Sequence, residues 1–484
     1  MNKIRCLIGL CLVLGLACNL NAQEPFLATN DSRKLDDSMR SMMHDAGIPG
    51  MSFAVIENNQ IVYFKTYGYK HLGNKGPVNR RTIFEAASLS KSALTFVAYK
   101  LIEEGLLDLD KPMYKYLAYP PLEHDPRYKL ITARMVLSHC SGIENLVFEY
   151  NPDTVDIVSN PGERWVYSGE GYVYLSKVEE LLLHKPYDDY IRDMVFEPLG
   201  LKRSFTHYTH NGKYPRNYAL PHNIFGKEGQ KWKPSVAFTP GSMNMTAKDY
   251  AKIFLMIFNG KYLSKNSISE ICRPVIQMDH ANPDLFYGTG FELLFGNGDT
   301  IISHGGSTGG FKAGVYYSKV KKSGFVYLSN SDRGDIIVNR INQLTAGFDL
   351  QGFFKSDLFP EYPSDGCNLL KTYNTRGLSG MFGAVENLKK TGDSVRIVKA
   401  LIEMGVIFLD KDTTTARRLL EDAVAYRYDS ATTTYLLGEA YLASHEYKMA
   451  YDLLMKAKEL HYERDIMDYD LKLCKQKMNA TSSK

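Results

Sequence analysis

Apolar and polar positions alternate in two distant parts of the chain, and both patterns are typical of β-strands. The stretch IPGMSFAVIENNQIVYFKTYGY, which begins at Ile48, predicts two strands about a turn at Glu57 to Gln60, preceded by a polar helix from about Arg33 to Ala46. Far downstream, GFELLFGNGDTIISHGGSTGGFKAGVYYSKVKKSGFVYLSNSD alternates apolar runs with Gly, Asn and Asp turns. Strands at both ends, with helices and loops between them, predict one α/β (α+β) domain over residues 23–350 that closes a single antiparallel sheet from distant sequence.

A third pattern, in the stretch FEAASLSKSALTFVAYKLIEEG, has the spacing of a helix. Its apolar residues recur three and four positions apart, and Gly105 can end the helix in a left-handed cap. Ser88 and Lys91 stand where this hydrophobic helix begins, although either side chain would be better solvated in water. The apolar positions are Leu94, Val97, Ala98 and Leu101.

The spacing of Ser88 and Lys91 suggests nucleophilic chemistry. Residues three apart on a helix share a face, so the lysine nitrogen can lie beside the serine hydroxyl. The N-terminal end of a helix and partial burial both disfavour a cation, and a neutral lysine amine can accept the serine proton. The backbone N–H of Ser88 would then point to where an acyl oxyanion forms. The alternative is that Ser88 caps the helix and Lys91 is solvated surface, because Ser-x-x-Lys alone occurs by chance.

The C-terminal part of the chain has an internal repeat. Leu437, Gly438 and Tyr441 fall where a tetratricopeptide repeat carries its own Leu, Gly and Tyr, and small Ala residues would let neighbouring helices approach closely. We therefore expect a linker over residues 351–390 and a tetratricopeptide-like helical domain over 391–484, with an unrelated helical bundle as the alternative. At one constant spacing, which matches the tetratricopeptide period, Ala416, Leu420 and Ala423 recur as Ala450, Leu454 and Ala457.

The segment from Met1 to Ala22 has the features of a secretory signal peptide. Two basic residues precede an apolar run from Leu7 to Ala17, and a small-residue cleavage site ends at Ala22. We therefore expect a secreted or periplasmic protein. A lipid-attached Cys18 is the alternative, but Gly15 stands where a lipobox usually carries Leu. No later stretch approaches the length of a membrane span, about 18 to 20 apolar residues.

Composition narrows the classes of partner. With 58 basic and 54 acidic residues and a formal net charge of +4, the chain is near charge balance, so nucleic acid is not an expected partner. The cysteines beyond the leader are scattered without a CxxC pair, which predicts neither a zinc site nor a disulfide framework. His207, His210 and His222 lie close in sequence but lack metal-binding helical spacing, so no metal site is predicted. The four cysteines are Cys140, Cys272, Cys367 and Cys474.

Several further stretches occur in a fixed order from about Leu35 to Asp332. They are IPGMSFAVI, FEAASLSK, GLLDLDKPMYKYL, LSHCSGI, PGERWVYSGEGYVYL, PLGL and HGGSTGGF. In these motifs the sequence resembles the serine hydrolases of the class C β-lactamase and penicillin-binding-protein family, which includes D-alanyl peptidases and esterases. The resemblance covers most of the predicted α/β domain and implies a β-lactamase/transpeptidase-like fold. It also implies an enzyme that needs no cofactor.

The resemblance implies roles for individual residues. Ser88 would be the acylated nucleophile and Lys91 its base, and Tyr167 would pass a proton to the leaving group. His304 to Gly306 would take the place of the family's Lys-Thr-Gly triplet, and Ser307 would give the second oxyanion N–H. The small residues there would let substrate lie against the strand as an added edge, and His304 could hold Tyr167 or a substrate carboxylate. The alternatives are a hairpin turn and a structural histidine.

Other residues in the motifs are interpreted as structural. His139 and Cys140 in LSHCSGI support the site, because a cysteine nucleophile would need an activating partner. Asp108 and Asp110 in GLLDLDKP cap or orient the loop that follows the nucleophile helix.

One motif departs from the family pattern. The family's loop usually reads Tyr-x-Asn, and here it reads Tyr167-Ser168-Gly169. Since that asparagine normally hydrogen-bonds the amide of a β-lactam or peptide, Gly169 predicts a preference for simple esters, unless a water or Ser168 replaces the missing group.

The sequence thus predicts a serine hydrolase that forms an acyl-enzyme at Ser88 and hydrolyses an ester, amide or D-amino-acid peptide bond in a small-molecule or peptide substrate. The alternative function is a peptidoglycan-fragment or penicillin-binding sensor that does not turn over and signals to a protein partner through its C-terminal repeats.

Overall fold

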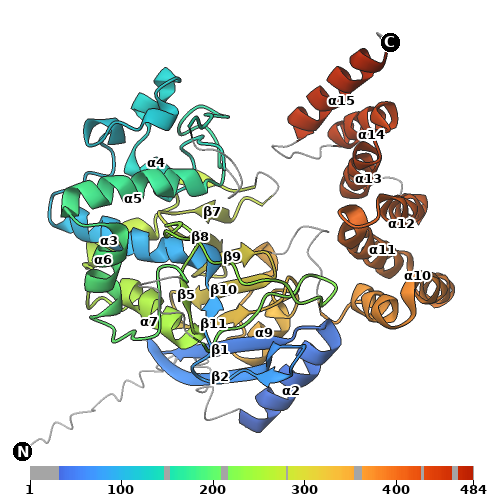
Figure 1. The fold of residues 1–484 in the computed structure, drawn as a ribbon, viewed down its shortest axis with the longest axis horizontal. Helices are drawn as coiled ribbons and strands as arrows, with labels where there is room; N and C mark the ends of the chain where they lie inside the picture. The colour runs from blue at the N-terminus through green and yellow to red at the C-terminus, as the bar shows by residue number, and fades with distance from the viewer. Residues whose placement is uncertain are drawn as a thin grey trace, which may run out of the picture.

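The structure is a computed structural model of the 484-residue chain. It describes residues 32–145, 153–208, 216–279, 282–353, 362–426, 430–460 and 467–482. The predicted signal peptide, Cys18 and His210 lie outside the described residues. A β-sheet with helices on both faces forms one part of the molecule, and a run of helices at the C-terminal end forms the other (Figure 1). No helix in the described ranges is long and apolar enough to cross a membrane.

The main sheet of the described residues has nine strands, and each is antiparallel to its neighbours. Their order is β3-β2-β1-β11-β10-β9-β8-β7-β6, so the first long strand lies beside the last, with Phe53 opposite Tyr327. A separate short pair, β4 (Phe84–Glu85) and β5 (Asn244–Met245), lies outside this sheet. The strands of the main sheet are β1 (Gly50–Glu57), β2 (Gln60–His71), β3 (Gly76–Pro77), β6 (Ile276–Gln277), β7 (Leu285–Tyr287), β8 (Glu292–Gly296), β9 (Asp299–Thr308), β10 (Phe311–Ser318) and β11 (Ser323–Ser329).

Helices cover both faces of the main sheet, so its central strands are buried on both sides. In β1, Phe53 and Val55 pack on the side of α2 and α9, whereas Ala54 and Ile56 pack on the side of α3 and α7. The helices of this part are α2 (Ser32–Ala46), α3 (Lys91–Glu103), α4 (Ala133–Leu137), α5 (Gly169–Leu183), α6 (Tyr187–Ile191), α7 (Ala247–Phe258), α8 (Lys265–Ile271) and α9 (Val338–Leu344). The short 3₁₀ or π turns are η1 (Ala87–Ser90), η2 (Met113–Lys115), η3 (Pro120–Leu122), η4 (Pro126–Leu130), η5 (Arg192–Phe196) and η7 (Gln351–Phe353).

These elements confirm the predicted α/β fold with an antiparallel sheet. The predicted first hairpin turns at Asn58 and Asn59, whose φ angles of 48° and 61° suit a two-residue turn with two left-handed positions. The helix after the nucleophile ends as expected before Gly105, which has a φ of 72°.

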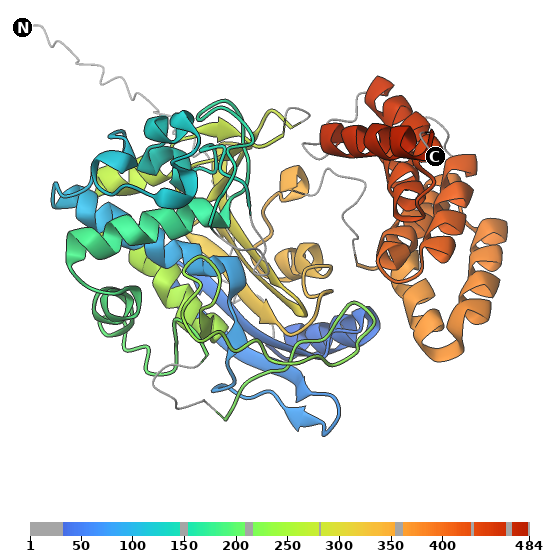
Figure 2. The same ribbon diagram turned by 45° about the horizontal axis from the view of Figure 1, so that its top comes forward.

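The C-terminal part consists of successive helices packed side by side (Figure 2). The six alanines and leucines of the predicted repeat are fully buried. The repeat also has a glycine contact: a Cβ at Gly405 would lie 2.7 Å from Leu420, and one at Gly438 would lie 3.0 Å from Leu454. In both repeats, a glycine of the first helix therefore lets a leucine of the second helix pack against its backbone. Membership of the tetratricopeptide family stays a prediction. The helices are α10 (Asp365–Thr391), α11 (Ser394–Leu409), α12 (Thr413–Tyr426), α13 (Ala431–Ala443), α14 (Tyr447–Glu459) and α15 (Met467–Ser482).

The predicted linker over residues 351–390 is wrong for most of its length. Helix α10 occupies residues 365–391, interrupted at Gly377, where the φ of 64° is not helical. Leu369, Leu370, Met381 and Val385 of this helix are buried in the core of the helical region. Closely spaced glycines and many polar side chains hide this helix in the sequence pattern.

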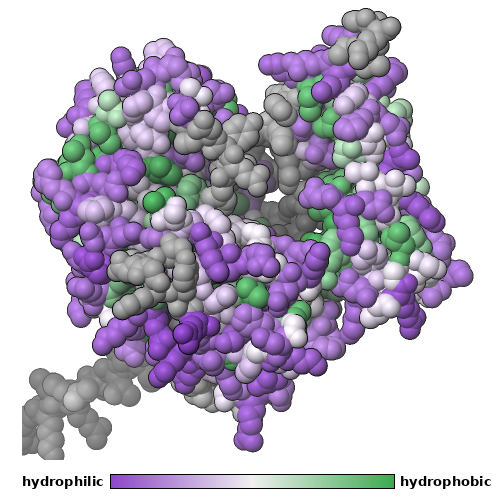
Figure 3. All heavy atoms as spheres, viewed as in Figure 1, coloured by the Kyte–Doolittle hydropathy of each residue, from purple (hydrophilic) through white to green (hydrophobic). Residues whose placement is uncertain are grey.

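The surface of the helical region is mixed in character. On the face in Figure 3, hydrophobic side chains appear there among hydrophilic ones, not as one continuous patch. The exposed large apolar residues of this region are Leu378, Val395, Val406, Tyr426 and Met449.

An aromatic cluster and a buried ion pair are among the contacts that join the helical region to the sheet part. Phe225, from a loop of the sheet part, has its ring centroid 5.7 Å from those of both Tyr373 and Phe408, and the Lys411 ammonium lies 3.6 Å from the same ring. A cavity of about 690 Å³ between α2, β2 and α10 lies beside these contacts and is not lined by Ser88.

The second contact is a buried ion pair. The Arg333 guanidinium, in a side chain only 5% exposed, lies 3.4 Å from the carboxylate of Glu403, which is 7% exposed. Arg333 also donates to the carbonyl of Ala46 at 2.9 Å and contacts the sulfur of Cys367 at 3.0 Å. Burial raises the pKa of Glu403, and the Arg333 charge opposes that shift.

We predict that Glu403→Ala lowers the free energy of unfolding by roughly 3 to 5 kcal/mol, because the buried Arg333 guanidinium loses its counter-charge. Urea unfolding followed by circular dichroism measures this. Glu446→Ala is the matched control: Glu446 pairs with Arg417, and both side chains are partly exposed, so its loss should cost less than about 1 kcal/mol. Equal losses in the two variants would mean that the Arg333 pair does not hold the interface.

Candidate active site

Ser88 lies in the tight turn η1 just before α3. Its predecessor Ala87 has a φ of 48°, a left-handed conformation that costs free energy for a residue with a side chain. Ala87, Leu89 and Ser90 are buried in this turn, while Ser88 is half-buried. The Ser90 hydroxyl donates to the Ala87 carbonyl at 2.6 Å and accepts from the backbone N–H of Met243 at 3.1 Å. These hydrogen bonds hold the strained turn, and within it Ser88 is more exposed than its neighbours.

The structure brings Ser88, Lys91 and Tyr167 together. The Tyr167 hydroxyl donates to Ser88 Oγ at 2.6 Å, and Lys91 Nζ lies 3.1 Å from the same oxygen. Lys91 is 2% exposed, donates to the carbonyl of Pro240 at 3.1 Å, and lies 4.8 Å from the centroid of the Tyr167 ring. A serine oxygen with two proton-exchanging groups in hydrogen-bond reach is the arrangement of an activated nucleophile.

Strand β9 runs directly past the nucleophile turn, and Gly306 makes this approach possible. A Cβ at Gly306 would lie 2.7 Å from the carbonyl oxygen of Ala86 and 3.3 Å from the backbone nitrogen of Ser88, so any side chain would push the strand away. Ser307, the next residue, is exposed. The backbone N–H groups of Ser88 and Ser307 are the candidate oxyanion donors, as the sequence predicts.

One edge of β9 is open beside Ser88. Strand β10 pairs with β9 from Ile301 to Thr308, whereas β8 pairs with β9 only from Asp299 to Ser303. Residues 304–308 therefore have a strand neighbour on one side alone among the described residues, and Gly305 has no atom within 4 Å of its Cβ position. An extended substrate can add to this edge by main-chain hydrogen bonds.

His304 is buried, and its environment keeps it neutral. Burial first, and the charge of Lys91 second, lower its pKa from 6.5 to about 3. Its Nδ1 lies 2.7 Å from the Gly305 carbonyl, so this nitrogen carries the proton and Nε2 is left as an acceptor. No hydrogen bond joins His304 to Tyr167 in the described residues. The geometry therefore gives no support to a cationic His304, and of its two predicted partners, Tyr167 and a substrate carboxylate, the first is not in contact with it among these residues.

His139 supports Tyr167 from behind. Its ring centroid lies 4.2 Å from that of Tyr167, and its Nδ1 accepts the backbone N–H of Ser168 at 3.1 Å. Its φ of 55° is left-handed, and its carbonyl accepts the N–H of Val166 at 2.7 Å. Burial, with the Lys91 charge, lowers its pKa well below 6.5. His139 thus holds the backbone on both sides of Tyr167 and packs against the Tyr167 ring, which agrees with its interpretation as structural support.

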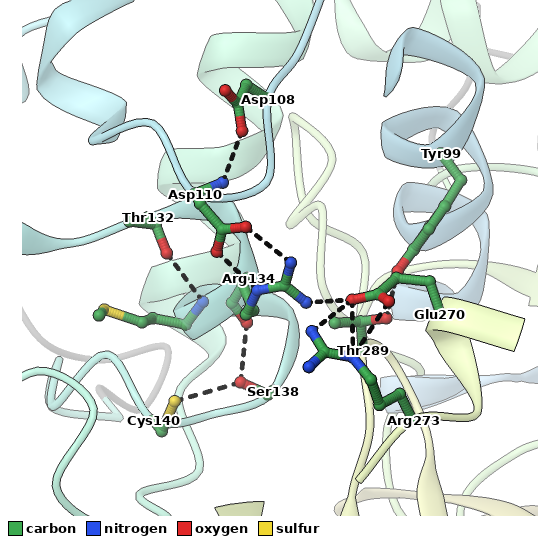
Figure 4. Close-up of polar contacts among 11 residues, drawn as sticks. Tyr99, Asp108, Asp110, Thr132, Arg134, Ser138, Cys140, Glu270, Arg273 and Thr289 are labelled. Carbon is green, nitrogen blue, oxygen red and sulfur yellow. Dashed lines mark hydrogen bonds and ion pairs between the residues drawn. The ribbon is translucent and has the colours of Figure 1, made fainter. Parts of the chain in front are cut away.

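An ionic cluster holds the helix that leads to His139 (Figure 4). Arg134 on α4 contacts Asp110 through two nitrogens, at 2.6 and 2.7 Å, and also pairs with Glu270, which in turn binds Arg273. Asp108 accepts the backbone N–H of Asp110, so both aspartates orient this loop as predicted. The same helix ends where the Ser138 hydroxyl donates to the Arg134 carbonyl.

A buried cluster around Lys231 and Glu85 was not predicted from the sequence. Lys231 Nζ lies 2.5 Å from Glu85 Oε1 and 2.7 Å from Asn244 Oδ1, and the Thr308 hydroxyl donates to Glu85 Oε2 at 2.9 Å. Glu85 comes three residues before the nucleophile, and Thr308 directly follows Ser307. The pair therefore ties together the two segments that carry the candidate oxyanion N–H groups. Burial lowers the pKa of Lys231, and Glu85 opposes that shift.

Gly169 is the first residue of α5, and Ser168 is its N-cap, whose hydroxyl accepts the N–H of Gly171 at 3.0 Å. The backbone N–H of Gly169 donates to the side-chain oxygen of Asn145 at 2.8 Å. Sequence reasoning did not identify Asn145, which lies outside every motif quoted above.

Two of the three histidines that lie close in sequence, His207 and His222, have partners in the structure. His207 lies beside Asp188 and Thr206, and His222 Nδ1 donates to the Asn330 carbonyl at 3.0 Å. Within the described ranges, no group of three His, Cys, Asp or Glu side chains is placed to hold a metal ion.

The alignments with curated relatives span only part of this chain and only about two thirds of the relatives' own length. Protein flp of Staphylococcus aureus strain MW2 is 25% identical over 334 residues, which are 62% of this chain and 64% of that protein. Penicillin-binding protein 4* of Bacillus subtilis strain 168 is 24% identical over 310 residues, or 57% of this chain and 67% of that protein.

Solved structures resemble the sheet part. An octameric penicillin-binding protein homologue from Pyrococcus abyssi matches with a TM-score of 0.58 and 26% identity, over 65% of this chain and 77% of that one. D-amino acid amidase from Ochrobactrum anthropi SV3 shares the fold, with a TM-score of 0.55 and 21% identity, over 64% of this chain and 96% of that one.

A family model described as β-lactamase matches residues 35–346, which include the nucleophile turn, the tyrosine loop and strand β9. The chain therefore belongs to the β-lactamase family of serine hydrolases, and a penicillin-binding protein and a class C β-lactamase are among the proteins that it resembles.

Proposed function

We propose that this protein hydrolyses an ester, amide or D-amino-acid peptide bond through an acyl-enzyme at Ser88. The observation that carries the proposal is the position of Ser88 Oγ, 2.6 Å from the Tyr167 hydroxyl and 3.1 Å from Lys91 Nζ, on an outward-facing strained turn. The names of the relatives support this class of reaction, since they include a penicillin-binding protein and a D-amino acid amidase.

The geometry supports a two-step reaction. Lys91 takes the Ser88 proton as Oγ bonds to the substrate carbonyl carbon, and the carbonyl oxygen becomes an oxyanion between the N–H groups of Ser88 and Ser307. When the oxyanion collapses, the leaving group departs with a proton passed through Tyr167. Water then attacks the acyl-enzyme, again losing its proton to the Tyr167 and Lys91 pair, and Ser88 is restored.

The location and partner are further proposals. The leader supports a secreted or periplasmic protein, and the helical region supports a protein partner. One observation favours the alternative of a sensor that acylates without turnover: Phe225, six residues before the buried Lys231, is held by the helical region. A long-lived acyl-enzyme after labelling would favour the sensor, and rapid return of free Ser88 would favour the hydrolase.

We predict that Ser88→Ala abolishes covalent labelling by a fluorophosphonate and by fluorescent penicillin, because the only atom lost is the nucleophilic oxygen. Labelling is measured by gel fluorescence and intact-protein mass spectrometry. Ser41→Ala, at an exposed position on α2, is the control, and it should retain a labelled Ser88. Persistent labelling of the Ser88→Ala protein at another residue would remove the proposal.

We predict that Lys91→Ala and Tyr167→Phe each lower the acylation rate by about 100-fold or more, since both remove a group positioned for proton transfer. Stopped-flow acylation with an aryl ester gives the rate constant. Tyr172→Phe is the control, because it removes a neighbouring hydroxyl that donates to the Leu137 carbonyl instead of Ser88. Acylation of Tyr167→Phe at the parent rate would show that the hydroxyl near Ser88 has no part in the chemistry.

The neutral His304 predicts an acid-sensitive fold. Its pKa is about 3 in the folded protein and about 6.5 in the unfolded chain, so the unfolded state binds more protons below pH 6.5. The stability is fully present above pH 6.5 and is lost as the pH falls toward 3, by up to about 1.4 kcal/mol per pH unit. Urea unfolding between pH 4.5 and 7.5 should show a shallower loss for His304→Gln, while His184→Asn at an exposed helix end should match the parent. An unchanged slope in His304→Gln would mean that His304 is protonated in the folded protein.

A further inference from the structure

A cavity at the junction of the two parts of the chain is separate from the site around Ser88. Its volume of about 690 Å³ lies within the range of small-molecule sites in proteins, roughly 300 to 1,000 Å³, and most of its wall is apolar. Helix α2 and strand β2 form one side of the wall, and α10, which lies against α2 (Figure 1), forms another. A molecule held here would therefore contact the sheet part and the helical region at once.

The apolar wall belongs to packed cores of both parts. Most of its large apolar side chains are buried, and they come from helices and strands that other contacts already hold in place. The wall is thus formed before any ligand arrives, and an apolar chain placed against it would leave water. The residues of this apolar wall include Met43, Ile48, Tyr67, Ile224 and Leu370.

Arg333 brings a buried guanidinium to the same wall. Its side chain is only 5% exposed, and its Nε donates to the Ala46 carbonyl at 2.9 Å. Its Nη2 contacts the Cys367 sulfur at 3.0 Å and the Glu403 carboxylate at 3.4 Å. Its Nη1 has no hydrogen-bond partner among the described residues, although a guanidinium offers five N–H donors. A planar guanidinium with donors to spare is well suited to bind a carboxylate.

The other charges of the wall also favour an anion. The Arg40 guanidinium lies 5.9 Å from the centroid of the Tyr67 ring and makes no ion pair or hydrogen bond within the described ranges. Asp45 is the acidic side chain of the wall, and it is already matched. The Tyr362 hydroxyl donates to its carboxylate at 2.9 Å, and Lys371 Nζ lies 3.8 Å from it. The wall therefore presents two guanidinium groups to a ligand and no carboxylate that lacks a partner in this part of the chain.

We propose that this cavity binds an organic carboxylate with an apolar chain. The carboxylate meets the Nη1 end of Arg333 in the positive field of Arg40, and the chain lies against the apolar wall. A small inorganic anion would leave that wall uncovered, and a neutral apolar molecule would leave Nη1 without an acceptor. The ligand joins the helical region to the sheet part, so its binding stabilises the folded protein. This binding site is independent of the reaction proposed for Ser88.

Decanoate tests the proposal, with decanol and decyltrimethylammonium as neutral and cationic molecules of the same chain length. Isothermal titration calorimetry of the full chain gives the three dissociation constants. We expect decanoate to bind about tenfold or more tightly than decanol, the effect of one charge-assisted hydrogen bond, and the cation to bind most weakly. A decanoate that carries a diazirine on its last carbon locates the site, because light should attach it to wall residues of α2, β2 or α10, which peptide mass spectrometry identifies.

Three variants assign the charge recognition. Arg333→Lys keeps the positive charge but removes the Nη1 donor, so it should weaken decanoate binding by about tenfold and leave decanol binding unchanged. Arg40→Gln removes an exposed charge without disturbing a buried contact, and it should weaken decanoate binding by about threefold, as for a partly exposed ion pair. Arg203→Gln is the matched control, because Arg203 is exposed and lies outside the wall, and it should keep the parent affinity.

Equal affinities for decanoate and decanol, or a parent-like decanoate affinity in Arg40→Gln, would overturn the proposal. Photolabelling confined to residues around Ser88 would overturn it as well, since decanoate would then be a ligand of the active site. Circular dichroism checks that each variant is folded. If Arg333→Lys unfolds, the comparison of Arg40→Gln with Arg203→Gln decides.

Discussion

The close approach of strand β9 to the nucleophile turn is the constraint on which the rest of the site depends. Position 306 must be a glycine, because a Cβ there would lie only 2.7 Å from the Ala86 carbonyl oxygen. This contact places the segments that carry the N–H groups of Ser88 and Ser307 side by side, and the turn that carries Ser88 holds Ala87 in a left-handed conformation. Ser90 holds this strained turn through hydrogen bonds to the Ala87 carbonyl and the Met243 N–H, so the donors are in position before a substrate arrives.

Buried polar groups around the turn maintain this geometry. Glu85 and Lys231 satisfy each other, and the remaining oxygen of Glu85 accepts from Thr308 on β9. In a low-dielectric interior such a pair adds little net stability, yet an unpaired member would be costly, so the pair specifies one arrangement of turn and strand. His139 and His304 differ from it because they stay neutral. Each presents one ring nitrogen to the interior that has no hydrogen-bond partner among the described residues.

Local pattern predicted those parts of the molecule in which neighbouring residues decide the structure. The Asn58–Asn59 turn and the helix that ends before Gly105 both follow from spacing and turn chemistry. The site was predictable where motif order placed Ser88, Lys91 and Tyr167 together. Lys231 could not be paired with Glu85 in advance, because 146 residues separate them and a buried lysine leaves no periodic signal. Asn145 was hidden for a similar reason, since its hydrogen bond to the Gly169 backbone leaves no signal in the sequence pattern. The glycines of α10 obscured a helix that tertiary packing nevertheless forms.

The pairing of β1 with β11 has a consequence for how the chain folds during synthesis. Met51 lies opposite Ser329, so the centre of the sheet joins segments from opposite ends of the domain. During synthesis, the amino-terminal hairpin leaves the ribosome long before the strand that must cover its edge. That edge exposes main-chain groups and apolar residues such as Phe53 throughout the interval, which makes the nascent chain dependent on slow, non-local closure and vulnerable to aggregation.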